Sequence, residues 1–124
     1  MSRPRILIAD DEQHIVTLLS MTLRKRGYEV LTADNGTRAL ELACAFPVDL
    51  VIADQTMPGL SGIELAEKLT GTAPVLIVTA RPEIRGEDQP NIAGVIHKPF
   101  SPNEIATRVR GLVGPAAPPR EQSA

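Results

Sequence analysis

The chain alternates between short apolar runs and longer segments in which apolar residues recur every three or four positions. The short runs have the composition of strands, and the most apolar of them suit strands buried on both faces of a sheet. These strands are expected at residues 5–10, 28–32, 48–53, 75–79 and 92–97. The longer segments predict helices at residues 12–26, 37–46, 63–70 and 102–113. Strands that alternate with helices predict an α/β protein with a doubly wound, five-stranded parallel sheet.

The helical pattern fails between the fourth and fifth strands. Residues 81–91 contain Pro82, Gly86 and Pro90, and Ile84 is their only strong hydrophobic residue. Proline and glycine both disfavour a helix interior, and one apolar side chain cannot form an apolar stripe. The fourth helix of the alternating pattern is therefore expected to be short or disordered.

The length and composition indicate one globular domain. The chain has 124 residues, of which 43% are hydrophobic and 23% charged; these are ordinary values for a globular domain. Residues 1–113 are expected to form the domain. Residues 114–124 contain three prolines and no core-forming side chain, so they are expected to form a disordered tail.

Several classes of function are disfavoured by the composition. The net charge is −2 and aromatic residues make up 2% of the chain, so no surface for direct nucleic-acid binding is expected. No apolar stretch is long enough for a membrane span, and no signal peptide is visible. The single cysteine, Cys44, excludes an internal disulfide and a zinc cluster, and its spacing predicts a buried position in the second helix. A cytoplasmic protein is the default expectation.

Polar and charged residues close four of the predicted strands. Asp10 and Asp11 follow the first strand, Asp54 the third, Thr79 the fourth and Lys98 the fifth. The carboxyl ends of parallel strands lie at one edge of a sheet, which is where open α/β sheets bind ligands. That edge is therefore expected to carry three carboxylates, one hydroxyl and one ammonium group.

These groups suit a magnesium-dependent phosphoryl-acceptor site. Crowded carboxylates raise each other's pKa, and a divalent cation relieves their repulsion. Mg²⁺ prefers a few hard oxygen ligands from protein, with water and phosphate completing its octahedron. An aspartate can act as the nucleophile in phosphoryl transfer and become an acyl phosphate. Lys98 and Thr79 offer an ammonium and a hydroxyl donor for phosphoryl oxygens.

Each of these residues also has an ordinary structural interpretation. Asp10 and Asp11 could cap the helix that follows them. Asp54 could be a turn residue, Thr79 a strand terminator, and Lys98 a plain exit from the last strand. The convergence of all of them on one sheet edge favours the metal and phosphoryl site.

Four short motifs carry a resemblance to a known family. They are Asp10-Asp11-Glu12, Asp54-Gln55-Thr56-Met57-Pro58-Gly59 with Ser61-Gly62, Thr79-Ala80 and Lys98-Pro99-Phe100. In this order and at these strand ends, they resemble the receiver domain of bacterial two-component response regulators over about residues 5–113. The resemblance implies a flavodoxin-like strand order and a single-domain signalling protein.

The resemblance also implies the role of each site residue. Asp54 would accept a phosphoryl group from a histidine kinase or a histidine phosphotransfer protein. Asp11, Asp54 and the backbone carbonyl of Thr56 would bind Mg²⁺. Asp10 would support the metal through water, and Lys98 and Thr79 would contact the phosphoryl group. Phosphorylation would then switch a surface that binds an unknown downstream protein.

The departures from the family pattern concern that surface. The family often has an aromatic residue three positions before the lysine, and this chain has Val95 there. The spacings from Asp54 to Thr79 and from Thr79 to Lys98 are also short for the family. These departures affect the surface that would change on phosphorylation, and they leave the phosphorylation site complete.

Other functions fit the sequence less well. A phosphorylation-independent interaction module with the same fold would be expected to lose part of the acidic, threonine and lysine set. An aspartyl phosphatase of the haloacid-dehalogenase type would carry an acid at position 56 and a cap domain. Dinucleotide binding would need a Gly-x-Gly-x-x-Gly motif after the first strand. The sequence thus predicts a signalling phosphoacceptor whose only enzymatic activities are its own phosphorylation and dephosphorylation.

Overall fold

A computed structural model describes residues 3–116. Its sheet has five strands in the order β2-β1-β3-β4-β5, and every neighbouring pair is parallel. The strands are β1 (Arg5–Ala9), β2 (Glu29–Ala33), β3 (Leu50–Asp54), β4 (Val75–Thr79) and β5 (Ile92–His97). This is the predicted doubly wound, flavodoxin-like order, in which the chain reverses direction across the sheet between β1 and β3.

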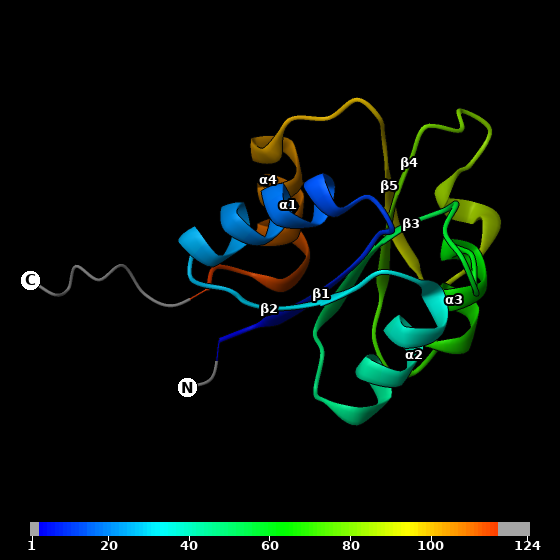
Figure 1. Cartoon of the computed structure of the whole chain (residues 1–124), viewed down its shortest axis with the longest axis horizontal. Helices are drawn as coiled ribbons and strands as arrows, with labels where there is room; N and C mark the ends of the chain where they lie inside the picture. Colours follow the sequence, from blue (N-terminus) through cyan, green and yellow to red (C-terminus); the bar gives the residue numbers. More distant parts are fainter. Residues whose placement is uncertain (1–2, 117–124) are drawn as a thin grey trace, which may run out of the picture.

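Four α-helices cover the sheet in two layers. They are α1 (Gln13–Lys25), α2 (Gly36–Ala45), α3 (Gly62–Lys68) and α4 (Pro102–Val113). Helices α1 and α4 lie on one face and α2 and α3 on the other (Figure 1). Each layer buries an aliphatic cluster, in which Leu19 and Ile105 represent the first face and Leu65 the second. Burial of this kind contributes about 25 cal/mol for each Å² of apolar surface removed from water.

The burial of the strands explains their sequence patterns. All five residues of β3 and all five of β4 are buried, because helices cover both faces of these central strands. Strand β2 lies at the edge of the sheet, and its Glu29 and Thr32 are exposed. The apolar runs were therefore clearest in the centre of the sheet and weakest at β2.

The prediction that no full helix connects the fourth and fifth strands is confirmed. The connection between β4 and β5 holds a single 3₁₀ turn, Gly86–Asp88. Two anchors fix this connection: Ile84 is only 6% exposed, and the Asn91 side-chain amide donates to the carbonyls of Ala66 and Ala73 at 2.9 and 2.8 Å. One buried aliphatic side chain and one amide thus replace the apolar face of a helix.

The start of α2 differs from the sequence prediction. The helix was expected at residues 37–46, but it begins one residue earlier: Asn35 is the N-cap of α2, and its side chain accepts a hydrogen bond from the Arg38 amide at 2.8 Å. Gly36 is the first helical residue, and a Cβ there would lie 2.1 Å from the carbonyl oxygen of Leu60. Glycine is needed at this position because the loop after β3 passes directly over it.

The prediction that Cys44 is buried is wrong. The buried face of α2 consists of Gly36, Ala39 and Ala43, and Cys44 is exposed. A residue directly after Ala43 is turned by about 100° around the helix axis, which carries Cys44 off the face that meets the sheet.

The chain after α4 is described only to residue 116. The Tyr28 hydroxyl donates to the carbonyl of Gly114 at 2.7 Å, and Ala116 packs against the cluster under α1 and α4. The predicted tail at residues 114–124 therefore begins with residues held on the domain, while residues 117–124 lie outside the described part. Among the described helices, none has the length and hydrophobicity that a membrane crossing requires.

Candidate functional site

The polar strand ends meet at one edge of the sheet, as predicted. Asp10, Asp54 and Thr79 are 4%, 8% and 1% exposed. The backbone fixes their positions: the Asp10 amide donates to the Ala33 carbonyl at 3.1 Å, and the Lys98 amide donates to the Thr79 carbonyl at 2.7 Å. These contacts continue the parallel ladders just past the ends of the strands and bring the functional side chains together.

Lys98 lies at the centre of the charged groups. Its Nζ atom is 3.0 Å from Oδ2 of Asp54, 3.3 Å from Oε1 of Glu12 and 3.9 Å from Oδ2 of Asp10. Burial opposes the positive charge, but the hydrogen bond to Asp54 and the nearby carboxylates outweigh burial and raise the pKa of Lys98. Lys98 therefore keeps its charge and partly neutralises three acids.

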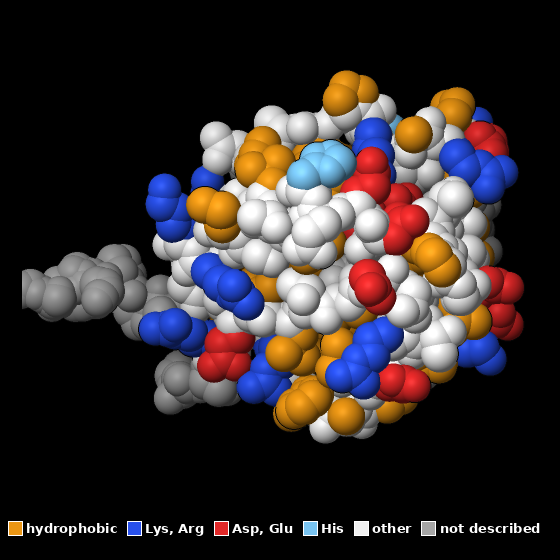
Figure 2. Space-filling model, viewed as in Figure 1, with side chains coloured by type: hydrophobic (Ala, Val, Ile, Leu, Met, Phe, Trp, Pro, Cys, Tyr) orange, Lys and Arg blue, Asp and Glu red, His pale blue; other side chains and the backbone are white. Residues whose placement is uncertain are grey.

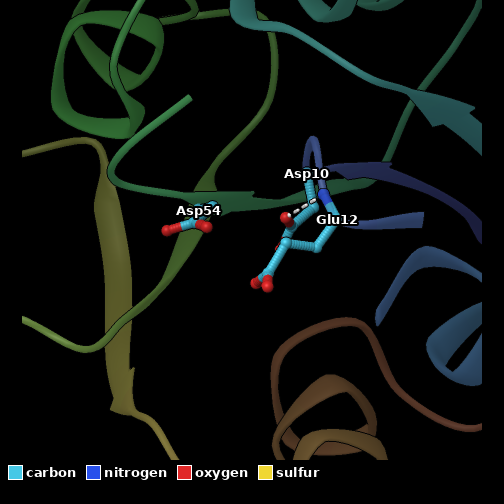
Figure 3. Close-up of side chains that lie close together, drawn as sticks. All are labelled: Asp10, Glu12 and Asp54. Carbon is cyan, nitrogen blue, oxygen red and sulfur yellow. Dashed lines mark hydrogen bonds between the residues drawn. The ribbon is translucent and has the colours of Figure 1, made fainter. Parts of the chain in front are cut away.

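The carboxylates of Asp10, Glu12 and Asp54 form an acidic cluster. One oxygen from each lies within 4.8 Å of the others, with Asp10 and Glu12 on the turn after β1 and Asp54 at the end of β3 (Figure 3). Burial raises the pKa of Asp10, and the charge of Asp54 adds to this, although a hydrogen bond from the Glu12 amide lowers it. The donors are all hard oxygens, so the cluster fits a hard divalent cation such as Mg²⁺ and lacks the nitrogen and sulfur ligands that zinc prefers.

The structure assigns the three acids after β1 to different surroundings. Asp10 is buried, and its Oδ1 accepts a hydrogen bond from the Glu12 amide at 2.9 Å. Asp11 is exposed and is not one of the clustered carboxylates; its predicted role as a metal ligand stays a prediction. Glu12 is the N-cap residue of α1 and has no side-chain capping bond. The structure therefore does not show Asp10 or Asp11 as the N-cap of α1.

Glu12 is the member of the cluster to which the sequence assigned no role. It was visible only as the third consecutive acid of a motif. Its carboxylate reaches Lys98, which is 86 residues away along the chain. Sequence spacing cannot reveal such a contact, because it depends on how far a side chain on the turn after β1 reaches toward the residue that follows β5.

The loop after β3 begins in an ordered turn. Oδ1 of Asp54 accepts a hydrogen bond from the Thr56 amide at 3.2 Å. The Gly36 amide, at the start of α2, donates to the Pro58 carbonyl at 2.9 Å. The backbone that would present the Thr56 carbonyl to a metal is thus tied to the phosphoacceptor candidate on one side and to α2 on the other.

Thr79 and Lys98 close the other side of the site. The Thr79 hydroxyl oxygen accepts a hydrogen bond from the Arg81 amide at 3.0 Å, which connects it to the segment between β4 and β5. The peptide bond between Lys98 and Pro99 is cis. Thr79 is therefore joined to Lys98 through the backbone, and Lys98 in turn contacts the acidic cluster.

The site combines buried and exposed charged groups: Asp10 and Asp54 are buried, and Glu12 is exposed. A hollow of about 290 Å³ lies elsewhere, between α1 and α2 beside β2, and Gln13, Thr32 and Arg38 line part of it. On the face drawn in Figure 2, acidic side chains gather beside a basic one close to the carboxyl edge of the sheet.

Replacing Asp10 with asparagine is expected to stabilise the metal-free protein by about 1 kcal/mol at neutral pH. Asparagine keeps the oxygen that accepts from the Glu12 amide, but it removes a buried charge beside Asp54. Because folding raises the pKa of Asp10, ionised Asp10 costs stability as pH rises through that pKa. The advantage of Asp10→Asn should therefore vanish below pH 3.8, the ordinary pKa of the carboxyl. Urea unfolding from pH 3 to 8 measures this; equal stability at pH 7 would contradict it.

The family model and the most similar curated sequences agree on one protein family. The sequence model of the response regulator receiver domain matches residues 6–110. The chain is 39% identical over 113 residues to the transcriptional regulatory protein KdpE of Mycobacterium tuberculosis, covering 87% of this chain and 50% of KdpE. It is 36% identical over 119 residues to PhoP of Bacillus subtilis, the alkaline phosphatase synthesis regulator, covering 88% and 48%. The chain thus spans about half the length of these curated relatives.

Solved structures show the same architecture. The response regulator TrrA of Thermotoga maritima, determined in complex with Mg²⁺ and BeF, superposes with a TM-score of 0.79 at 36% identity, covering 88% of this chain and 98% of TrrA. A Francisella response regulator receiver domain superposes with a TM-score of 0.80 at 31% identity, covering 89% and 96%. Both similarities extend over nearly the whole of the compared domain.

Proposed function

Because the chain belongs to the response regulator receiver domain family, we propose that Asp54 accepts a phosphoryl group in a Mg²⁺-dependent reaction. The donor would be a histidine kinase or a histidine phosphotransfer protein. The observation that carries the proposal is the place of Asp54: its carboxylate lies 3.0 Å from Lys98 and beside two other carboxylates at the open edge of the sheet. A nucleophile and a charge-stabilising ammonium are thus in contact before any ligand binds.

The chain's own residues account for the steps of the transfer. A carboxylate oxygen of Asp54 attacks phosphorus, and the bond from phosphorus to the donor breaks with its electron pair leaving on the donor. Lys98 turns from Asp54 and Glu12 to the incoming phosphoryl oxygens, and the Thr79 hydroxyl donates to another of them. Bound Mg²⁺ would offset the negative charge that the carboxylates and the phosphoryl group bring together.

The proposed metal ligands are Asp11, Asp54 and the backbone carbonyl of Thr56, with Asp10 acting through water. Two features support this set. The clustered oxygens are within 4.8 Å of one another, which is close enough to share one cation, and the exposed side chain of Asp11 is free to turn toward them. Glu12, which lies in the cluster through its contact with Lys98, would be released when Lys98 moves to the phosphoryl group.

The downstream effect would be a change of the surface around the segment after β4. The Thr79 hydroxyl oxygen accepts a hydrogen bond from the Arg81 amide, so a movement of the Thr79 side chain toward a phosphoryl group would alter a contact that shapes this segment. Val95 is only partly buried and has no ring that could move into the space beside Thr79. The proposed partner is a separate protein that reads this surface, and the proposed location is the cytoplasm, where its kinase would phosphorylate it.

Mg²⁺ is expected to raise the melting temperature, and Mg²⁺ with beryllofluoride to raise it further. A ligand that binds only the folded state stabilises it by about 2.7 kcal/mol at a hundredfold excess over its dissociation constant. Both shifts should disappear in Asp54→Asn. They should persist in Asp34→Asn, which alters an exposed acid just after β2. If millimolar Mg²⁺, alone or with beryllofluoride, leaves the wild-type melting temperature unchanged, the phosphorylation-independent module is supported instead.

A further inference from the structure

Gln55 is a buried polar residue directly after Asp54, and its side chain is not part of the acidic cluster or of the contacts of Lys98. It is 8% exposed. Its side-chain oxygen Oε1 accepts a hydrogen bond from the Ile63 amide at 2.9 Å, and its backbone carbonyl accepts one from the Gly62 amide at 3.2 Å. Gln55 therefore accepts hydrogen bonds from the first two amides of α3, which lie seven and eight residues further along the chain.

These bonds make α3 and the end of β3 one unit. The Ser61 side chain accepts from the Glu64 amide, so Gln55 and Ser61 share the amides that a helix start leaves without helical partners. A Cβ on Gly62 would lie 3.0 Å from the Asp54 carbonyl oxygen and 3.2 Å from Cα of Gln55. The start of α3 is thus packed directly on the backbone between Asp54 and Thr56.

We infer that Gln55 is a positioning residue that holds the Thr56 carbonyl in the direction needed to bind Mg²⁺. This inference rests on the proposed function. The Thr56 amide is held by its hydrogen bond to Asp54. Gln55, the residue directly before Thr56, is held by its two hydrogen bonds from the start of α3. Residues 55–61 connect β3 to α3, and without the Gln55 side chain the backbone of this seven-residue loop would sample several directions for the Thr56 carbonyl. Removing partners that orient metal ligands typically weakens metal binding by about 10- to 100-fold.

Metal binding and the bond between Ile63 and Gln55 should stabilise each other. If the bond from Ile63 to Gln55 favours metal binding, then metal binding must favour that bond by the same factor. Mg²⁺ should therefore slow hydrogen exchange at the Ile63 amide in the wild-type chain. If this bond only stabilised the fold, hydrogen exchange at the Ile63 amide would not depend on Mg²⁺.

The test compares two variants of the full chain by calorimetric Mg²⁺ titration. Gln55→Met keeps a side chain of similar length but cannot accept from the Ile63 amide as the glutamine oxygen does; it should weaken Mg²⁺ binding by about tenfold. Ser61→Ala removes the neighbouring cap of the same helix without touching the residue before Thr56. It should stay within about twofold of the wild type, although it loses a comparable capping bond.

The outcomes separate this inference from the proposed function. If the wild type binds Mg²⁺ and folded Gln55→Met binds it equally well, Gln55 has no positioning role. If both variants weaken binding alike, the effect belongs to helix stability and the inference is again wrong. If Gln55→Met does not fold, Ile63 exchange in the wild type decides, and exchange that is unchanged by Mg²⁺ overturns the inference. If the wild type itself does not bind Mg²⁺, the proposed function fails.

Discussion

The Asp54→Asn variant is expected to take up no phosphoryl group from acetyl phosphate and Mg²⁺, whereas the wild type takes up one per chain. Asparagine keeps the oxygen that accepts from the Thr56 amide, so the loop after β3 should be preserved. It lacks the anionic oxygen that attacks phosphorus, and an amide is too weak a nucleophile to replace it. Intact-mass spectrometry measures the added phosphoryl mass directly.

The control for this experiment is Asp34→Asn. Asp34 follows β2 at the same edge of the sheet, but it is exposed and is not part of the acidic cluster. This variant should be labelled like the wild type. Labelling that persists in Asp54→Asn would move the acceptor to another residue and would contradict the assignment.

Replacing Lys98 with methionine should produce the second large effect. In the metal-free protein, its ammonium lies within 4.0 Å of three carboxylates, and Asp10 and Asp54 are buried. Losing a charged hydrogen-bond partner typically costs about 2 kcal/mol, so Lys98→Met should lower the unfolding free energy by about that amount. It should also slow phosphorylation markedly, since no ammonium remains to meet the phosphoryl oxygens.

The pH dependence of the Lys98 effect follows from its raised pKa. The stabilisation is fully present below the ordinary pKa of lysine, which covers neutral pH, and it is lost as pH rises through the higher folded value. Saturating Mg²⁺ should narrow the gap between Lys98→Met and the wild type, because a cation then compensates the same acids. Lys68→Met, at an exposed position near the end of α3, serves as the control in urea unfolding. A Lys98→Met variant as stable as this control without metal would contradict the account.

The parts of the fold that could be predicted from sequence are those with strong local signals. The predicted bounds of β4, β5 and α4 match the structure. Strand β4 is buried throughout and reads as a continuous apolar run, and Ser101 marks the start of α4, where its side chain accepts from the Glu104 amide. The gathering of Asp10, Asp54, Thr79 and Lys98 followed from a single rule, since parallel strands end at one edge.

The contacts that could not be predicted depend on the reach of side chains over long sequence distances. The Glu12 carboxylate reaches Lys98 across 86 positions of the chain, and the Gln55 side chain accepts from an amide that belongs to another element. Cys44 had core spacing, but the narrow buried face of α2 stops at Ala43. The predicted helix began at Thr37 and missed Gly36, because no local signal shows that the Leu60 carbonyl passes over this residue.

The central claim is that Asp54 is the single, Mg²⁺-dependent phosphoacceptor, and site mapping tests it most directly. The wild-type chain would be incubated with acetyl phosphate, with Mg²⁺ or with a chelator, and the acyl phosphate would then be reduced with borohydride and mapped by peptide mass spectrometry. The account predicts one modified residue, Asp54, and only in the presence of Mg²⁺. Modification at a different residue, or equal modification of Asp54 with the chelator, would contradict it.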